Sequence, residues 1–167
     1  MLLRRPRFDD EATILEMITE FEDHNSQHDG GFWNPREFSY NDWLQQNCEY
    51  EMGINIPSHF VPSIQLVSFD ANNRALGFLN LRLRLNDVLL QKGGHIGYSI
   101  RPTERGKGYA KEQLRQGLQL AKEKNIKSVL LTCHKDNLAS RKTILACGGR
   151  YEDTRDNVER YWIDLEG

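Results

Sequence analysis

The sequence has no long hydrophobic run, because no apolar stretch approaches the ~18 residues that a membrane-spanning helix needs. The first ten residues also lack the apolar core of a signal peptide. We therefore expect a soluble protein with no membrane partner. Only three cysteines occur, Cys48, Cys133 and Cys147, and their spacing is not that of a zinc site. These features argue against a disulfide framework and a metal site, and they favour the reducing cytoplasm.

A large excess of one charge is also absent. The net charge of -2 argues against a nucleic-acid partner. The distribution is uneven, however: 12 acidic residues and one basic residue, Arg36, lie between Asp9 and Glu51, whereas eight basic and three acidic residues lie between Arg101 and Lys127. Either these charges coat solvated helix faces, or the chain offers an acidic surface to a cationic ligand and a basic surface to an anionic one.

The length of 167 residues, with 38% hydrophobic and 28% charged residues, indicates one globular domain. Hydrophobic periodicity and turn residues predict helices at 11–23, 38–50, 108–124 and 137–146, and strands at 2–5, 63–69, 75–85, 95–101, 127–133, 150–155 and 158–165. This order predicts an α/β (α+β) fold with a single mixed, mostly antiparallel sheet and helices on both of its faces. The passage from 95 to 133 must then be a right-handed crossover.

A glycine-containing turn joins the strand at 95–101 to the next helix, and it reads Arg105-Gly106-Lys107-Gly108-Tyr109-Ala110. Glycine allows close approach of the backbone to a ligand and turn geometries that a Cβ would obstruct. The start of the following helix presents unpaired N–H groups and a partial positive charge. Together these features predict an anion cradle suited to a pyrophosphate, although the run is neither a Walker A loop nor a G-x-G-x-x-G fingerprint.

The same run resembles the Arg/Gln-x-x-Gly-x-Gly/Ala motif of the GNAT family of N-acetyltransferases, through Arg105, Gly108 and Ala110. The preceding strand (IGYSI) and the following helix resemble the family's motif A. The strand KSVLLTC, followed by Asn137 to Ser140 and a helix that ends at Gly148-Gly149, resembles motif B. The resemblance implies a single GNAT domain over 1–167, with a variable acceptor-side part at 1–62 and an acetyl-CoA-binding core at 63–167.

In the GNAT fold two central strands splay apart, here those at 95–101 and 127–133, and acetyl-CoA lies in the opening. The resemblance implies that the pantetheine arm pairs with the backbone near Ser99 and Ile100. Asn137 would reach the pantetheine or the thioester, with Ser140 close by, although Asn137 is equally suited to capping a helix. The pyrophosphate would lie on the loop residues Arg105, Gly106, Lys107, Gly108, Tyr109 and Ala110. No metal takes part.

The family's chemistry is direct transfer of the acetyl group from the thioester to a primary amine, which must lose a proton. Many members carry a glutamate early on the strand before the loop, where this chain has Gly94 or His95. We expect His95 to act as the base through water, or else to be a packed strand histidine. Many members also place a tyrosine, the acid that protonates the thiolate, where this chain has Ile144. Our candidates for that acid are Tyr98, Ser140 and His134.

The acceptor is less well defined, because two features of the sequence suggest different substrates. Trp33, Trp43, Tyr40 and Tyr50 lie in the variable N-terminal part among acidic residues, which suits an amine cation if they are not core residues. Arg82 and Arg84, which alternate with leucines along a predicted strand, could instead face an acceptor carboxylate.

Other functions are compatible with parts of this pattern. Since the glutamate and the tyrosine are absent, a non-catalytic acyl-CoA-binding sensor or scaffold is the main alternative. A nucleotide-binding module of another fold is a third possibility. The final strands form a hairpin around Asp156 and Asn157, and an exposed hairpin of this kind could pair across a homodimer.

Overall fold

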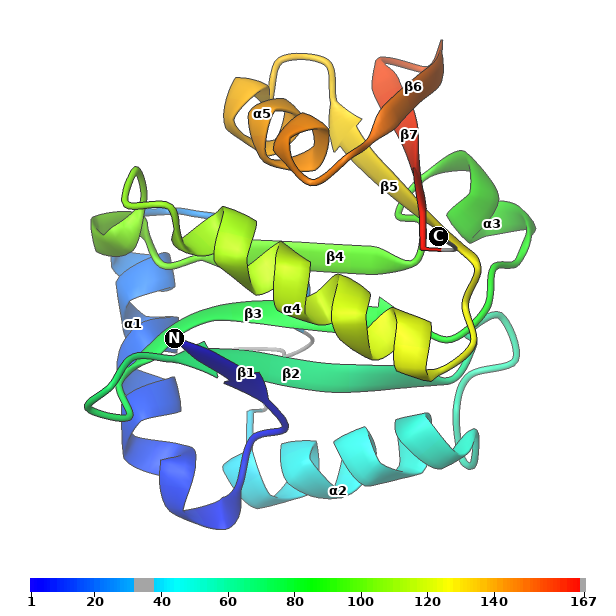
Figure 1. The fold of residues 1–167 in the computed structure, drawn as a ribbon. Helices are drawn as coiled ribbons and strands as arrows, with labels where there is room; N and C mark the ends of the chain where they lie inside the picture. The colour runs from blue at the N-terminus through cyan, green and yellow to red at the C-terminus, as the bar shows by residue number, and fades with distance from the viewer. Residues whose placement is uncertain (32–37, 166–167) are drawn as a thin grey trace.

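The computed structural model describes residues 1–31 and 38–165, and its strands form two antiparallel sheets (Figure 1). The first sheet has the order β1-β2-β3-β4, with bounds Leu2–Arg4, Ser63–Phe69, Ala75–Arg82 and Ile96–Ile100. The second has the order β5-β7-β6, with bounds Ser128–His134, Val158–Asp164 and Arg150–Arg155. Because β1 pairs with β2, the N-terminal part contributes a strand to the first sheet.

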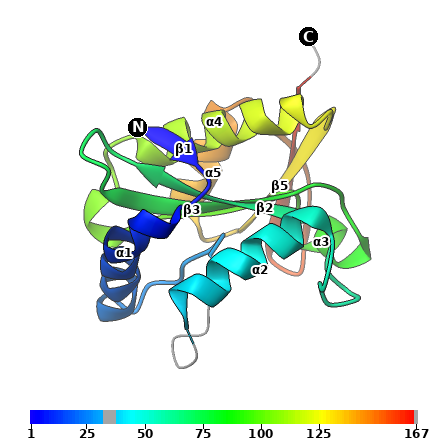
Figure 2. The same ribbon diagram turned by 90° about the horizontal axis from the view of Figure 1, so that it is seen from below.

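Helices cover both faces of the first sheet (Figures 1 and 2). The helices α1 (Glu11–Asp23) and α2 (Tyr40–Met52) pack on one face, and α4 (Tyr109–Glu123) packs on the other. The helix α5 (Leu138–Ala146) packs on the second sheet and against α4. Two short 3₁₀ helices, η1 (Phe8–Asp10) and η2 (Pro102–Glu104), precede α1 and α4. This arrangement confirms the predicted α/β class, with helices on both faces.

Two apolar cores hold these layers together. One lies between α4, α5 and both sheets, and its buried members include Leu79, Leu114, Leu131 and Tyr161. The other lies between α1, α2 and the first sheet, and its members include Phe21, Trp43 and Phe78. Because the first core contains residues of both sheets, it fixes how the two sheets are set relative to each other.

The predicted single sheet is divided at the boundary between β4 and β5. The His95 N–H donates to the Leu130 carbonyl at 2.8 Å, and the Leu130 N–H donates to the His95 Nδ1 at 2.9 Å. Beyond this junction, no strand pairing joins β4 to β5 in the part of the chain that the structure describes. The two strands diverge there (Figure 1), as the GNAT resemblance implied.

Two other local predictions differ in their outcome. The strand predicted at 75–85 ends at Arg82, and a short helix, α3 (Asp87–Gln91), follows it. The Asn86 side chain caps α3 by accepting from the Leu89 N–H at 2.9 Å. The hairpin between β6 and β7 is confirmed, with Asp156 and Asn157 at φ +49° and +68°. None of the described helices is long and apolar enough to cross a membrane.

Candidate active site

The edge of β4 that faces β5 carries backbone groups that no neighbouring strand uses. Two bonds to β3 fix which groups these are: the Arg82 N–H donates to the His95 carbonyl at 2.7 Å, and the Arg101 N–H donates to the Leu76 carbonyl at 2.8 Å. In an antiparallel ladder such bonded pairs recur at every second residue. The backbone groups of 97 and 99 therefore also point to β3, whereas those of 96, 98 and 100 point away from it.

This alternation changes one predicted contact of the pantetheine arm. The backbone N–H and C=O groups of Ser99 point toward β3, whereas its side-chain Oγ donates to the Asp29 carbonyl at 2.7 Å. Tyr98 and Ile100 carry the outward groups instead. The Ile100 carbonyl already accepts from the Arg105 Nε at 2.8 Å. A strand-like ligand along this edge would thus meet Tyr98 and the Ile100 N–H, rather than Ser99.

The glycine turn that follows has the geometry expected of an anion cradle. Gly106 and Gly108 lie at φ +78° and +86°, which favour glycine, and a Cβ at either position would meet no atom within 4 Å. Gly108 is the N-cap of α4. The N–H groups of Tyr109, Ala110 and Lys111 begin the helix and have no partner within it. Open space therefore lies next to unpaired donors at the positive end of a helix dipole.

The two cationic side chains of the turn, Arg105 and Lys107, bind other residues of the chain. The Lys107 Nζ donates to Glu104 at 2.8 Å. The Arg105 Nη2 donates to the Ser26 Oγ at 2.7 Å, in addition to the bond from Nε described above. Both side chains are exposed at the rim of the turn, where an anion would compete with Glu104 for Lys107.

Two predicted catalytic residues meet across the space between the diverging strands. The Tyr98 hydroxyl lies 2.9 Å from the Ser140 Oγ, so that β4 and α5 are joined by a hydrogen bond between side chains. Burial raises the pKa of Tyr98 to about 12, and the phenol therefore stays protonated. Asn137 holds the backbone of Ser140, because its side chain caps α5 by accepting from the Ser140 N–H at 3.1 Å.

This cap confirms one of the two roles considered for Asn137. The residue is exposed, and its carbonyl oxygen is used by the cap. A contact between Asn137 and the pantetheine remains a prediction. His134, another candidate acid, is exposed at the end of β5, where its Nδ1 accepts from the Asp136 N–H at 3.2 Å.

The position of His95 does not suit a general base. Its side chain is 6% exposed, and burial together with the nearby Arg82 guanidinium lowers its pKa to about 4. The neutral ring has one nitrogen lone pair, and this lone pair at Nδ1 accepts the Leu130 N–H. The structure therefore supports the alternative that His95 is a packed residue, which joins the two sheets where they diverge.

The acceptor-side predictions also have structural outcomes. Tyr40 and Trp43 are each 4% exposed in the core under α2, and Tyr50 packs edge-on against Phe60. Trp33 lies outside the described residues. These three aromatic side chains therefore pack within the fold, in line with the alternative that they are core residues.

The two arginines of the β3 region differ from each other. Arg84 is exposed, whereas Arg82 is half-buried, and its Nη1 donates to the Gly93 carbonyl at 3.1 Å. Burial lowers the pKa of Arg82 to about 10, so that it remains cationic at neutral pH. Its guanidinium lies beside Gly97, where a Cβ would come within 3.2 Å of it, on the face of the sheet that α1 and α2 cover.

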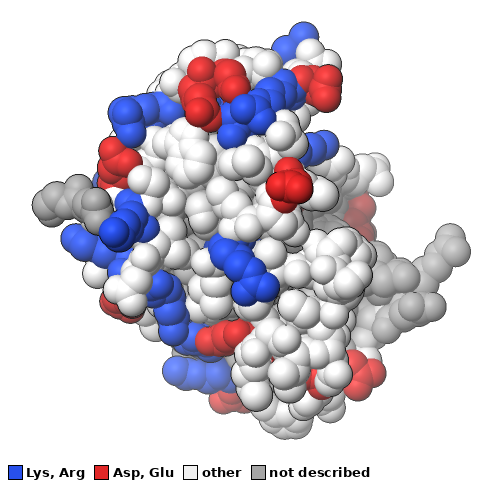
Figure 3. All heavy atoms as spheres, turned by 90° about the vertical axis from the view of Figure 1, so that its right-hand side faces the viewer, with Lys and Arg blue, Asp and Glu red and all other residues white. Residues whose placement is uncertain are grey.

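Part of the acidic stretch is neutralised within the fold. Four of its carboxylates bind arginines from outside the stretch, in the pairs Asp10–Arg4, Glu51–Arg5, Glu16–Arg101 and Glu20–Arg101. On the face shown in Figure 3, acidic and basic side chains are interspersed and not segregated. Arg101, which is fully buried at the end of β4, was not among the predicted functional residues. Its one signal is an arginine directly after an apolar strand.

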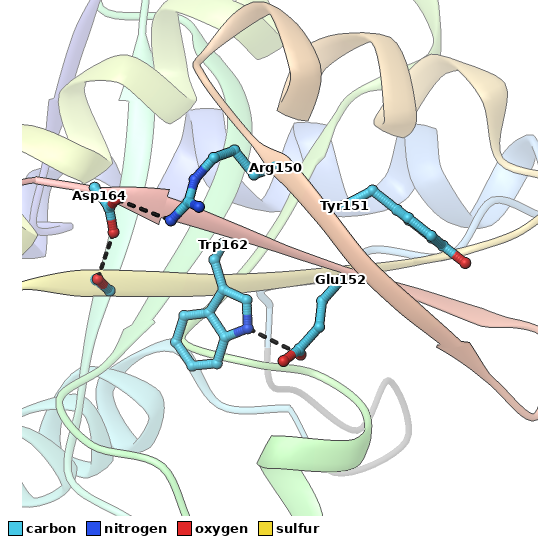
Figure 4. Close-up of a pocket in the computed structure, with 6 residues that line it drawn as sticks. Arg150, Tyr151, Glu152, Trp162 and Asp164 are labelled. Carbon is cyan, nitrogen blue, oxygen red and sulfur yellow. Dashed lines mark hydrogen bonds and ion pairs between the residues drawn. The ribbon is translucent and has the colours of Figure 1, made fainter.

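A cavity of about 430 Å³ lies elsewhere, on the outer face of the second sheet (Figure 4). Several of its polar groups bind one another. Arg150 and Ser128 both bind Asp164, at 2.9 and 2.7 Å, and the Trp162 Nε1 donates to Glu152 at 3.0 Å. This hollow is separate from the glycine turn and the Tyr98–Ser140 pair, and the candidate site is therefore the space between the diverging strands.

The sequence matches the family model of the acetyltransferase (GNAT) domain over residues 1–150. No curated protein matches the sequence.

Solved structures resemble the fold at low sequence identity. A ribosomal-protein-S5-alanine acetyltransferase from Vibrio fischeri has a TM-score of 0.72 at 16% identity, over 98% of this chain and 92% of that one. A chimera of the spermidine N-acetyltransferase SpeG from Vibrio cholerae and hSSAT has a TM-score of 0.61 at 18% identity, over 98% and 96%. yncA from Salmonella typhimurium, in a structure with its cofactor acetyl-CoA, has a TM-score of 0.64 at 17% identity, over 99% and 94%. Because the family model matches residues 1–150 of the 167 in this sequence, the chain belongs to the GNAT family of acetyltransferases.

Proposed function

We propose that this protein transfers an acetyl group directly from acetyl-CoA to the nitrogen of a primary amine. The observation that carries the proposal is one continuous surface. The outward backbone groups of β4 lead from the Tyr98–Ser140 pair to the open turn at Gly106 and Gly108. An extended arm that ends in a pyrophosphate matches this surface in both shape and charge.

Residues of this chain would hold acetyl-CoA along its whole length. Tyr98 and the Ile100 N–H offer strand-like pairing to the pantetheine amides. The backbone from Gly106 to Ala110 offers N–H groups to the pyrophosphate, while Arg105 and Lys107 supply positive charge at the rim. The second amide atom of Asn137, which the cap does not use, would face the thioester end.

In the reaction, the neutral amine nitrogen attacks the thioester carbonyl, so that a C–N bond forms and the C–S bond breaks. The thiolate that leaves takes a proton from the Tyr98 hydroxyl, which the Ser140 hydroxyl orients at 2.9 Å, and Tyr98 regains a proton from solvent. The phenol is suited to this donation because burial keeps it protonated. The amine loses its proton to solvent, since the Nδ1 lone pair of His95 is already bonded to Leu130.

The acceptor belongs to the primary amines of small molecules, peptides or proteins. Structural neighbours are described as acting on spermidine and on alanine of a ribosomal protein, and both are amines. We expect the chain to work as one unit over 1–167, with 1–62 on the acceptor side and 63–167 binding acetyl-CoA.

A panel of amines tests this function. Purified protein is incubated with acetyl-CoA and with spermidine, free amino acids, peptides with an N-terminal alanine or peptides with an internal lysine. Thiol release is recorded, and the product mass is checked for one added acetyl group. Turnover with one class supports the proposal and names the acceptor. Tight binding of acetyl-CoA without turnover on any amine would instead support the alternative, a non-catalytic acyl-CoA-binding sensor or scaffold.

Two further assignments accompany this function. We place the protein in the cytoplasm, because Cys48, Cys133 and Cys147 are all free thiols. We also propose a homodimer through β6, which is an edge strand whose Tyr151 is 57% exposed. Light scattering after size-exclusion chromatography would return twice the chain mass for a dimer, and a Tyr151→Glu variant should return the monomer mass.

A further inference from the structure

We propose that Glu20 of α1 is a positioning residue that holds the start of the acetyl-CoA loop in its binding conformation. The inference rests on the proposed function, since it assigns a role in acetyl-CoA binding to a helix on the opposite side of the sheet. The C-terminal end of α1 lies beside η2, directly before the glycine turn (Figures 1 and 2).

The first part of the contact fixes the end of β4. Arg101 is fully buried, and its Nη1 donates to Glu16 at 2.7 Å and to the Ala75 carbonyl at 2.9 Å. Its Nη2 donates to Glu16 at 2.6 Å and to Glu20 at 2.9 Å. A guanidinium held by four hydrogen bonds cannot rotate, and the chain therefore leaves β4 in one direction.

The second part of the contact binds η2 at Thr103, and of the two glutamates only Glu20 supplies it. The Glu20 Oε2 accepts from the Thr103 N–H at 3.1 Å, and its Oε1 accepts from the Thr103 Oγ1 at 2.9 Å. Among the hydrogen bonds of the described residues, none joins Glu16 to Thr103. The Glu20 side chain is 12% exposed, whereas that of Glu16 is 54% exposed. Glu20 thus binds the end of the strand and the following turn with one carboxylate.

The glycine turn needs such an anchor, because it has little packing of its own. A Cβ at Gly106 or Gly108 would touch nothing within 4 Å. One end of the turn is fixed by α4, which buries Leu114 and Leu118 in the core. The other end is η2, which Glu20 holds through Thr103 and which Arg74 holds through Glu104 at 2.6 Å. Since an anion site needs its donors preorganised, loss of this anchor should weaken acetyl-CoA binding.

The arrangement is poorly explained by stability alone. A buried ion pair often contributes no more to stability than a hydrophobic replacement of similar volume. Here the Arg101 Nε is also buried without a hydrogen-bond partner, which is a cost. A charged cluster with such a cost is better explained by the geometry that it imposes on the segment leading into the turn.

Two matched variants test the proposal. Glu20→Gln and Glu16→Gln each remove one negative charge from Arg101, but only Glu20→Gln also weakens the hold on Thr103. We expect Glu20→Gln to raise the dissociation constant and the KM for acetyl-CoA about tenfold, or ~1.4 kcal/mol. The kcat and the acceptor KM should stay near those of the wild type. For Glu16→Gln we expect a change of less than about threefold in the same constants.

A third variant covers the case in which Glu20→Gln fails to fold. Thr103→Val keeps the shape of Thr103 and removes the hydroxyl that Glu20 accepts. It should raise the acetyl-CoA dissociation constant in calorimetry and speed hydrogen exchange of amides 103–110. An acetyl-CoA affinity that is unchanged in both Glu20→Gln and Thr103→Val would overturn the inference and leave the proposed function standing. A wild-type protein that does not bind acetyl-CoA would instead overturn the proposed function itself.

Discussion

Tyr98 and Ser140 are the pair of side chains on which the chemistry proposed for this protein most depends. A buried phenol with a pKa of about 12 is protonated at neutral pH, so it can donate a hydrogen bond to the sulfur as negative charge develops there in the transition state. The family's usual tyrosine is replaced by the fully buried Ile144. A hydroxyl from β4 can therefore take the place of one from α5, because the two elements face each other across the same space.

Removing this hydroxyl should slow the chemical step more than binding. For Tyr98→Phe we expect the kcat for thiol release to fall about 10²-fold, in the range of general acid catalysis, with little change in the acetyl-CoA KM. Tyr151→Phe is the control, since it removes another tyrosine hydroxyl, one that lies 2.7 Å from Thr154 at the far hairpin. A kcat near that of the wild type in Tyr98→Phe would eliminate Tyr98 as the acid.

His95 should affect stability and not the pH dependence of the rate. His95→Ala leaves the buried Leu130 N–H without its side-chain partner, which should cost about 1–3 kcal/mol in the free energy of unfolding. His95→Asn offers an oxygen to the same N–H and should recover part of that loss. Both variants should show a pH–rate profile of the same shape as the wild type, measured from pH 6 to 10. Loss of an inflection that the wild type shows would mean that His95 is the base after all.

The effect of Gly108 on ligand binding can be distinguished from its effect on stability by comparison with Gly148, a glycine of similar φ outside the turn. Gly108 and Gly148 have φ values of +86° and +94°, and a Cβ at either would touch nothing within 4 Å. Alanine at each should therefore cost a similar backbone strain, about 1–2 kcal/mol. Only Gly108→Ala places a methyl group beside the predicted pyrophosphate, so only this variant should weaken acetyl-CoA binding in calorimetry. Equal affinities in the two variants would contradict our location of the cradle.

At the scale of elements, α1 and the segment after it hold the end of β4 and the loop that follows. Apart from Glu20, this segment provides Ser26, which accepts from Arg105, and the Asp29 carbonyl, which accepts from Ser99. Residues before position 32 thus contact the end of β4 and the glycine turn at several points.

The ion pairs of Arg101 with Glu16 and Glu20 predict how the free energy of unfolding depends on pH. Hydrogen bonds from Arg101 and Thr103 outweigh the opposing effect of burial and lower the pKa of Glu20 to about 2, from 4.5. A group with a lower pKa in the folded state stabilises it fully above the unfolded value, and this contribution is lost as the pH falls from 4.5 toward 2. In urea unfolding, wild type and Glu20→Gln should differ most at pH 6–7 and converge as the pH approaches 2. A difference that stays constant with pH would mean that the carboxylate charge is not involved.

Sequence patterns predicted the elements better than their arrangement. The helix at 108–124 and the hairpin around Asp156 were predictable because periodicity and turn residues act over a few positions. The split into two sheets was not, since it depends on which strands pair at long range. The ion cluster was missed for the same reason, because Arg101 and Glu16 are 85 positions apart.

The site shows the same limit at finer scale. Alternation along β4 predicts which side chains share a face, but not which backbone groups face the open edge. That choice follows from the register with β3, which cannot be read from the sequence. Ser99 and Ile100 were therefore predicted to face the ligand, whereas Tyr98 and Ile100 carry the outward groups. Likewise, a histidine on a strand can be a base or a junction, and its partner Leu130 becomes visible only in the fold.

For the whole molecule, two sheets joined at one corner and held by a shared core form a wedge whose walls are β4 and β5. The wall at β4 leads to the glycine turn and α4, and the wall at β5 leads to α5 with Ser140. Since each wall continues into an element that supplies a predicted ligand contact, acetyl-CoA should stabilise the wedge as a unit.

The most direct test of this account is thermal unfolding of the purified protein with acetyl-CoA, CoA, ATP or NAD, one ligand at a time. A ligand at 100 times its dissociation constant adds about 2.7 kcal/mol to the free energy of unfolding, which is readily detected as a higher Tm. We predict that acetyl-CoA and CoA raise the Tm and that ATP and NAD do not. A Tm that neither CoA species moves would contradict the acetyl-CoA site and every residue role that depends on it.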